Sequence, residues 1–188
     1  LWGGDDAPAV ANVLEGVLKL VAATADGREQ IVGIVFPSDF IGRPFGKESP
    51  YSVSAISAAE LCIFHRDQFD EFAADHPDLQ QKLLRRTLGE LDRARRWMLL
   101  LGRKSASEKV ASFLLDMADR LSPPPGAADT ARGFELPFGR QQIADILGVT
   151  IETTSRQLTK MRADGLIDLP SRRKIVLNDL AALNEMAG

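Results

Sequence analysis

The segment that most constrains the fold is residues 140–156, which read RQQIADILGVTIETTSR. One apolar helix face is indicated by three residues with helical spacing, Ile143, Ala144 and Leu147. Gly148 follows where the chain must turn sharply with a positive φ, and Thr150 is placed to cap a second helix. The segment therefore predicts two helices joined by a tight turn.

The second of these helices carries polar side chains near its start that suit the edges of DNA bases. Glu152, Ser155 and Arg156 stand at positions i, i+3 and i+4, so they share one face. Arg can hold guanine O6 and N7 in a fork, Glu can accept from cytosine N4, and Ser can serve either role. An amphipathic hairpin with a solvated polar face is the alternative. The coincidence of turn, cap and base-reading side chains favours a helix-turn-helix that binds double-stranded DNA.

Two short β-prone runs follow, at residues 166–169 and 174–177. Between them lies a turn whose tip collects the basic residues Arg172, Arg173 and Lys174. A solvated turn could have the same composition. Beside a recognition helix, however, such side chains can contact phosphates, so we expect a wing.

Composition indicates a globular protein whose charge is unevenly spread. The net charge is −3, with 5 Lys/Arg against 12 Asp/Glu in residues 1–77 and 18 against 14 in the rest. A duplex would therefore be held by a local patch rather than by net charge. No apolar run reaches the roughly 18 residues of a membrane helix, and a single cysteine fits a reducing compartment. We expect a cytoplasmic protein with no membrane contact.

The first 70 residues read as short strands separated by turns. Apolar or β-branched runs occupy residues 13–21, 31–36, 51–56 and 60–64, and a hairpin signal lies at 25–28. This pattern predicts a β barrel or a jelly roll. The chain starts at Leu1 without a Met, so we expect a longer protein whose N-terminal segment is absent here.

A long helix is expected from about Asp78 to Leu101, where there is no proline and a single internal glycine. Six residues recur within it at alternating spacings of three and four: Leu84, Thr87, Leu91, Ala94, Met98 and Leu101. That is the seam of a coiled coil. The helix could instead pack on its own domain. Its place between a β-rich part and a helix-turn-helix favours pairing with a second copy as a homodimer.

A further helix is expected up to about residue 121, capped by Ser105 or Ser107 and burying Val110, Phe113, Leu114 and Met117. A stiff loop at 122–126, a strand at 134–137 and a final helix from Asn178 to Met186 complete the pattern. The fold class expected is α+β: a β-rich sensor domain (1–77), a dimerisation helix (78–103) and a winged helix-turn-helix domain (104–188).

These segments resemble the CRP/FNR family of transcription regulators over the whole chain. Residues 27–42 resemble the family's sensor hairpin, and residues 97–104 are similar to the end of its dimer helix. The run at 152–156, ETTSR, looks like the E-T-x-S-R signature of the FNR and FixK branch, in particular of FnrL-like members.

The resemblance implies a homodimeric regulator that responds to oxygen or redox state, contacts RNA polymerase and binds a palindrome like TTGAT-N4-ATCAA. Arg140 stands where family members contact a phosphate. Ile151 stands where cyclic-AMP-responsive members carry Arg, and it could meet a thymine methyl group. The full set of expected DNA contacts is Arg140, Thr150, Ile151, Glu152, Ser155, Arg156, Lys160 and Arg172.

Two departures argue against cyclic AMP as the signal. Members that bind it have a Glu after the glycine of the Phe-Ile-Gly turn, whereas Arg43 follows Gly42 here. They also hold the phosphate with Arg-Ser/Thr, and the corresponding stretch here is Ser49-Pro50-Tyr51, without a cation. An alternative function is a cyclic-nucleotide-type regulatory domain that responds to another small-molecule effector.

Cys62 stands where FNR proteins place the sensor-domain ligand of a [4Fe–4S] cluster. Such clusters take four thiolates, and family members supply the other three from an N-terminal segment. Cys62 could equally be a small apolar residue of a strand. We expect His65 and His76 to be solvent-exposed rather than haem ligands. No paired carboxylates, Ser/His/Asp set or phosphate loop indicates an enzyme.

Overall fold

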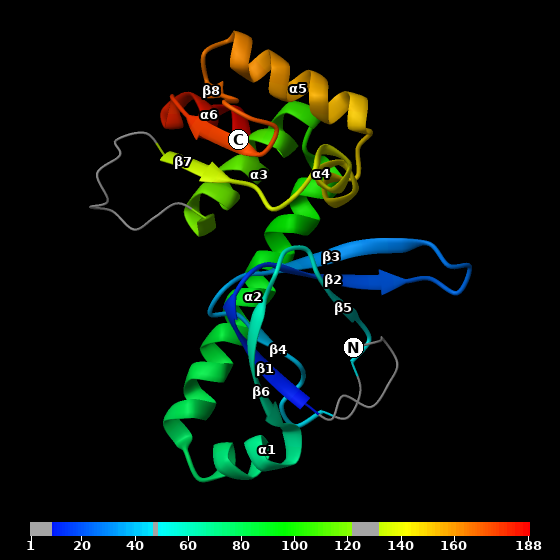
Figure 1. Ribbon diagram of the computed structural model, residues 1–188, viewed down its shortest axis with the longest axis vertical. Helices are drawn as coiled ribbons and strands as arrows, with labels where there is room; N and C mark the ends of the chain where they lie inside the picture. The colour runs from blue at the N-terminus through cyan, green and yellow to red at the C-terminus, as the bar shows by residue number, and fades with distance from the viewer. Residues whose placement is uncertain (1–8, 47–48, 122–131) are drawn as a thin grey trace. The chain divides into compact units, whose positions relative to one another are not determined.

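The computed structural model describes residues 9–46, 49–121 and 132–188 (Figure 1). Its contacts divide the chain into two units, Leu1–Arg93 and Ala94–Gly188. The boundary falls inside one helix, so the three-part division expected above stays a proposal. In the described parts of the chain, no helix combines the length and apolarity that a membrane crossing requires.

The first unit contains two antiparallel three-stranded sheets, with strand orders β4-β1-β6 and β3-β2-β5. The strands are β1 (Ala9–Glu15), β2 (Leu18–Ala23), β3 (Glu29–Val35), β4 (Phe40–Ile41), β5 (Ser52–Ala55) and β6 (Glu60–His65). Their core is a cluster of buried aliphatic residues drawn from both sheets, Ala11, Val13, Leu18, Val35 and Ile41. The expected β-rich roll is therefore confirmed.

Gly16 divides the run that we read as one strand over residues 13–21. It has φ 84°, and a Cβ atom there would lie 2.2 Å from the carbonyl oxygen of Ala58. Only glycine fits both the left-handed backbone and this close approach. The chain therefore leaves β1 at Gly16 and enters β2 in the other sheet.

A short helix that the sequence reading missed, α1 (Arg66–Ala74), follows β6 directly. Residues up to 70 were expected to be strands, and that boundary was wrong. The ring of Phe69 packs 5.4 Å from the ring of Phe40, and Asp70 accepts the backbone N–H of Phe45 at 3.0 Å. The aromatic residues of this segment are also common in strands, so the sequence did not distinguish the helix. Through these two contacts α1 stabilises the turn that follows β4.

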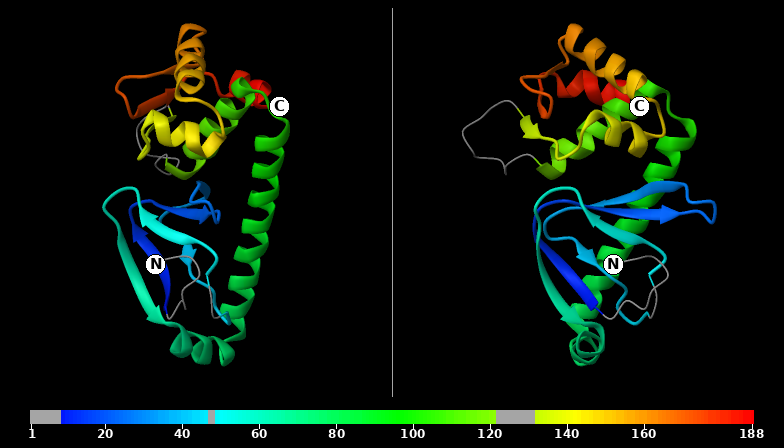
Figure 2. Two further views of the ribbon diagram at one scale, coloured as in Figure 1. Left: turned by 90° about the vertical axis from the view of Figure 1, so that its right-hand side faces the viewer. Right: turned by 45° about the vertical axis from the view of Figure 1, so that its right-hand side comes forward.

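The long helix expected from Asp78 to Leu101 is confirmed as α2 (Pro77–Arg103), which runs without a break (Figure 2). The structure describes all of its 27 residues, and of these only Leu100 is buried. A helix this long gains its stability mainly by packing an apolar face. Most of that packing is therefore missing from the single chain.

The second unit builds its core on α3, whose Val110, Phe113, Leu114 and Met117 are fully buried as expected. The elements after α2 are α3 (Ala106–Leu121), β7 (Arg132–Glu135), α4 (Arg140–Leu147), α5 (Ile151–Ala163), β8 (Ile167–Asp168), β9 (Lys174–Leu177) and α6 (Leu180–Ala187). The strands form one antiparallel sheet in the order β7-β9-β8. The strand expected at 134–137 lies two residues earlier, at 132–135, and the loop expected at 122–126 lies outside the described residues.

The structure decides between the candidate helix caps. Ser105 caps α3, because its N–H donates to Glu108 Oε2 at 2.6 Å and its hydroxyl accepts the N–H of Glu108 at 3.4 Å. Hydrogen bonds from the Ser105 side chain and from its backbone N–H lower the pKa of the Glu108 carboxyl group. At α6 the expectation was wrong: Asp179, not Asn178, accepts the N–H of Ala182, at 2.9 Å. The Asn178 side chain donates to the carbonyl of Gly165 instead.

Candidate nucleic-acid interface

The turn between α4 and α5 has the geometry that its glycine predicts. Gly148 adopts φ 62° and ψ 42°, the left-handed conformation that commonly ends a helix. The N–H groups of Gly148 and Val149 both donate to the carbonyl of Ala144. At the other end of α4, the side chain of Gln142 accepts the N–H of Gly139 at 2.8 Å. Hydrogen bonds therefore fix α4 at both ends.

Thr150 caps α5 as expected. Its backbone is extended, and its Oγ1 accepts the N–H of Thr153 at 3.2 Å. Three residues anchor the inner face of α5 at spacings of four and three, Thr154, Leu158 and Met161, each buried to 1% exposure or less. Because this face is fixed to the core, the opposite face of α5 has to point toward solvent.

The outward face of α5 brings together the expected base-reading residues. Glu152 and Arg156 are exposed, and Ile151 and Ser155 are half-buried. Hydrogen bonds from its own backbone N–H and from the Thr150 side chain lower the pKa of Glu152. At neutral pH this face therefore offers a carboxylate acceptor, a hydroxyl and a guanidinium fork within one helical turn.

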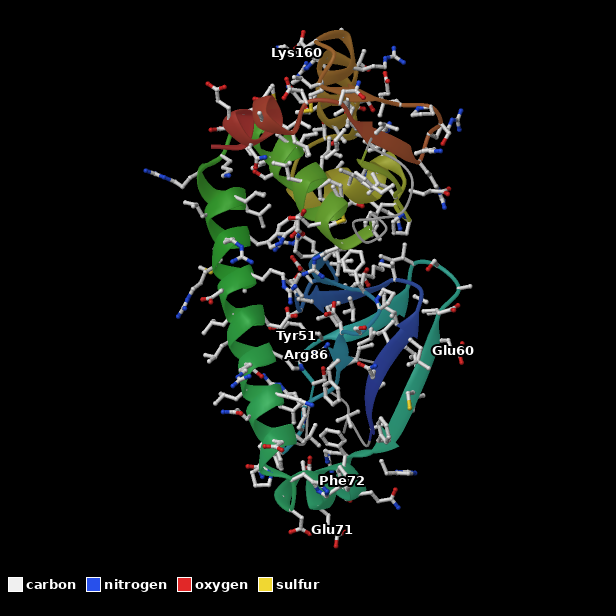
Figure 3. All side chains as sticks on the ribbon, turned by 90° about the vertical axis from the view of Figure 1, so that its left-hand side faces the viewer. Tyr51, Glu60, Glu71, Phe72, Arg86 and Lys160 are labelled. Atoms are coloured by element: carbon white, nitrogen blue, oxygen red, sulfur yellow. The ribbon has the colours of Figure 1, made fainter. Side chains whose placement is uncertain are left out.

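Lys160 and Thr159 extend the same face toward the end of α5, and both are exposed. Figure 3 shows Lys160 at the outer edge of its unit. Thr159 is a candidate that the sequence reading missed. Its spacing could have found it, because it lies seven residues after Glu152 and three after Arg156.

Arg140, the first residue of α4, has a partly buried guanidinium group. The side chain is half-buried, and its Nη1 atom is shielded from solvent without a hydrogen-bond partner among the described residues. Burial lowers the pKa of this guanidinium, although an arginine remains charged at neutral pH. A shielded N–H donor without a partner costs free energy, which an anion bound at this position would recover.

The wing expected at residues 166–177 forms from β8, β9 and their connecting turn. Ser171 organises this turn, because its Oγ accepts the N–H groups of Arg173 at 3.3 Å and Lys174 at 3.0 Å. Arg172 is exposed there with both of these basic neighbours. The turn therefore presents three cations in succession, a composition suited to phosphate contacts.

All six residues of the expected seam on α2 are exposed: Leu84, Thr87, Leu91, Ala94, Met98 and Leu101. Met98 is 73% exposed and Leu84 58%, large values for apolar side chains. The seam reading missed Leu88, which is 51% exposed and widens the same stripe. The expected seam contained heptad positions a and d only, whereas Leu88 occupies position e, four residues after Leu84.

Cys62 lies half-exposed on β6, where it pairs with Asn12 of β1. The described residues contain no group of three or more His, Cys, Asp or Glu side chains that could hold a metal, and the printed sequence has one cysteine. A [4Fe–4S] cluster needs four thiolates, so these residues do not fit one.

Two family models match this chain. The "Cyclic nucleotide-binding domain" matches residues 1–76, and the "Crp-like helix-turn-helix domain" matches residues 108–186. The first covers the two β-sheets and the second covers the helix-turn-helix with its wing. The fold class expected from the sequence is thereby confirmed.

Known proteins resemble the chain over nearly its full length. The transcriptional activator protein FnrL of Cereibacter sphaeroides is 43% identical over 100% of this chain and 76% of its own. The nitrogen fixation regulation protein FixK of Bradyrhizobium diazoefficiens is 46% identical over 83% of this chain and 65% of its own. The structure of FixK2 from Bradyrhizobium japonicum superposes with a TM-score of 0.88 at 33% identity, covering 100% of this chain and 92% of that one.

Proposed function

Because this chain belongs to the CRP/FNR family of transcription regulators, we propose that it acts as a homodimer whose two α5 helices read a palindromic duplex. The family supplies the general activity, which is DNA-binding regulation of transcription rather than catalysis. The finer proposal concerns which residues read the DNA, how the dimer forms and which signal it answers.

The observation that carries this proposal is the outward face of α5. Glu152, Ser155 and Arg156 combine an acceptor, a hydroxyl and a fork of donors on a helix whose opposite face is anchored in the core. Bidentate donors and acceptors at this spacing discriminate base edges in the major groove. We assign Ile151 to the methyl group of a thymine and expect half-sites like TTGAT and ATCAA.

Phosphate contacts set the position of the helix on the duplex. We assign Arg140, Lys160 and Arg172 to this role. Arg140 is supported by its shielded Nη1 atom and Arg172 by the exposed basic turn. Thr150 caps the first turn of α5, and we assign it to the same phosphate backbone.

The exposed stripe on α2 supports the proposed dimer. Contiguous exposed apolar side chains are unusual on a protein surface, and a stripe of them marks an interaction surface. Heptad spacing over about two and a half repeats suits a parallel pair of helices. A dimer would give the two α5 helices the two-fold symmetry of a palindrome.

The signal that we propose is oxygen or redox state, and the promoter partner is RNA polymerase. Both are supported by the resemblance of the 152–156 run to the FNR and FixK branch, and the second also by the activators among the relatives. A band-shift assay performed in air and under anaerobic conditions tests the signal. Equal DNA affinity under the two conditions would remove oxygen as the signal for this chain.

A band-shift and sedimentation experiment tests the central proposal. The protein should bind a duplex carrying TTGAT-N4-ATCAA as a dimer, and at least a thousand-fold more tightly than a scrambled duplex of equal length. A duplex with one half-site replaced is the control for two-fold binding. Equal affinity for the three duplexes would show that this face does not read sequence.

A second candidate function is the sensing of a small anionic molecule by the first unit. A cavity of about 710 Å³ lies between α2 and the turn after β4, and its charged lining consists of Arg86 and Arg93 together with Asp39 and Glu90. The Nε atom of Arg93 is shielded and has no hydrogen-bond partner among the described residues, although another nitrogen of its guanidinium pairs with Glu90. Thermal unfolding with a series of small carboxylic acids tests this role, with Arg93→Ala as the control.

A further inference from the structure

The exposed stripe of α2 is bordered by two rows of side chains that a dimer would bring close together. With Leu84, Leu91 and Met98 at heptad position a, the residues at e are Leu88, Arg95 and Gly102, and those at g are Leu83, Glu90 and Trp97. Each row therefore contains one charged residue. The two charges have opposite sign, and Arg95 lies five residues after Glu90.

A spacing of five residues is the one that brings two side chains together across a parallel coiled coil. A residue at g of one helix meets the residue five positions later, at e, of the facing helix, and ion pairs between these rows set partner choice and orientation. We propose that Glu90 of one copy pairs with Arg95 of the second copy, twice across the two-fold axis, and that this pair selects a parallel dimer in one register. The proposal rests on the dimer of the proposed function and adds the device that aligns it.

Both side chains are accessible for such a contact. The Glu90 side chain is 59% exposed, and Arg95 is exposed on the same helix. Glu90 accepts a hydrogen bond from Arg93 of its own helix, but a carboxylate has a second oxygen and further lone pairs. Arg95 also has an interaction within its own chain, and its five N–H donors leave capacity for a carboxylate across the seam.

The alternative registers lack this pair. A shift of one heptad puts Glu90 of one copy opposite Gly102 and Glu90 of the other copy opposite Leu88, and it puts the two Arg95 side chains opposite Trp97 and Leu83. Such a shift leaves the charges without partners across the interface. Since apolar seams tolerate such shifts, a single charged pair can decide the register, as polar positions do in other coiled coils.

Charge reversal tests the pair in the whole chain. Glu90→Arg makes both borders of the seam basic, and Arg95→Glu makes both acidic. Each variant alone should dissociate roughly ten-fold more readily than the parent in low salt, and the difference should shrink at high salt. An equimolar mixture should form mixed dimers well above the statistical half, because each chain then meets opposite charges across the seam. Arg96→Glu, a reversal at the exposed position next to Arg95, is the matched control and should behave like the parent.

Native mass spectrometry of the mixture and sedimentation of each variant give the decisive readings. A statistical mixture, or equal dissociation of the Arg95→Glu and Arg96→Glu variants, would overturn the ion pair while leaving a dimeric, DNA-binding parent intact. A monomeric parent that still binds one half-site would instead overturn the dimer itself. An excess of mixed dimers together with a parent-like control supports the pair.

Discussion

The Oγ1 atom of Thr150 accepts the N–H of Thr153 at 3.2 Å and so closes the first turn of the helix that we assign to DNA recognition. Caps of this kind stabilise helices by satisfying an N–H group that has no partner within the helix. The same turn contains Ile151 and Glu152, so the cap also fixes the side chains nearest the expected bases.

Replacing Thr150 by alanine should lower the free energy of unfolding by about 1 kcal/mol, because the N–H of Thr153 loses its acceptor. Chemical denaturation followed by circular dichroism measures this change. Thr159→Ala, on the exposed part of the same helix, is the control and should change stability by less than about half as much. Equal losses for the two variants would mean that the cap contributes no stability of its own.

Arg156→Ala should weaken binding to the palindrome by about 1–3 kcal/mol and leave binding to random DNA nearly unchanged. The reason is that a guanidinium fork reads guanine, and its loss removes specificity rather than charge attraction alone. Fluorescence anisotropy with both duplexes provides the measurement. Parallel losses on the two duplexes would reassign Arg156 to the phosphates.

Arg140→Ala should weaken binding to every duplex alike and reduce the slope of affinity against salt concentration by about one. A single lost phosphate contact predicts this result, and the shielded Nη1 atom motivates it. The measurement is a salt titration of the variant, the parent and Arg85→Ala, which alters an exposed residue of α2. An unaltered slope combined with a changed base preference would contradict the phosphate assignment.

Leu91→Lys should convert the protein into a monomer in sedimentation. Burying a leucine is worth roughly 1.5–3 kcal/mol per side chain, and the variant also places two like charges across the two-fold axis. Binding to the palindrome should fall with it, while the helix content of the chain should remain. A variant that still sediments as a dimer through α2 would rule out this seam.

Cys62→Ser should change the free energy of unfolding by less than about 1 kcal/mol, because the half-exposed position lets a hydroxyl remain hydrated. DNA affinity of this chain should remain unchanged, since its residues do not fit an iron–sulfur cluster. Thermal denaturation and the band-shift assay check both expectations, with Ala59→Ser as an exposed control on the turn before β6. A loss of binding in the Cys62 variant alone would give the thiol a role that the described residues do not explain.

Local sequence signals were sufficient to predict much of the fold and of the candidate site. Gly148 and Thr150 predicted the turn and the cap of the helix-turn-helix, because each acts through its own backbone or the next turn. The absence of proline between Asp78 and Leu101 predicted α2. The outward face of α5 followed from helical spacing alone, once the start of the helix was fixed.

Some of the expectations that failed depended on contacts between distant parts of the chain. Another depended on two adjacent residues that can both cap a helix. Gly16 ends β1 because Ala58, more than forty residues later, approaches its Cα atom. The helix α1 is held by Phe40, which the sequence does not mark as a partner of Phe69. Asn178 and Asp179 can both cap a helix, and only the structure shows which side chain reaches the N–H of Ala182.

If two copies meet through the uncovered stripe of α2, the amount of protein in the cell becomes a regulatory variable. If the stripe is buried only when two copies meet, the concentration of dimer at low abundance rises with the square of the chain concentration. Halving synthesis would then reduce operator occupancy about four-fold in that range. A promoter controlled by such a protein would respond to its abundance more steeply than one controlled by a monomer of equal affinity.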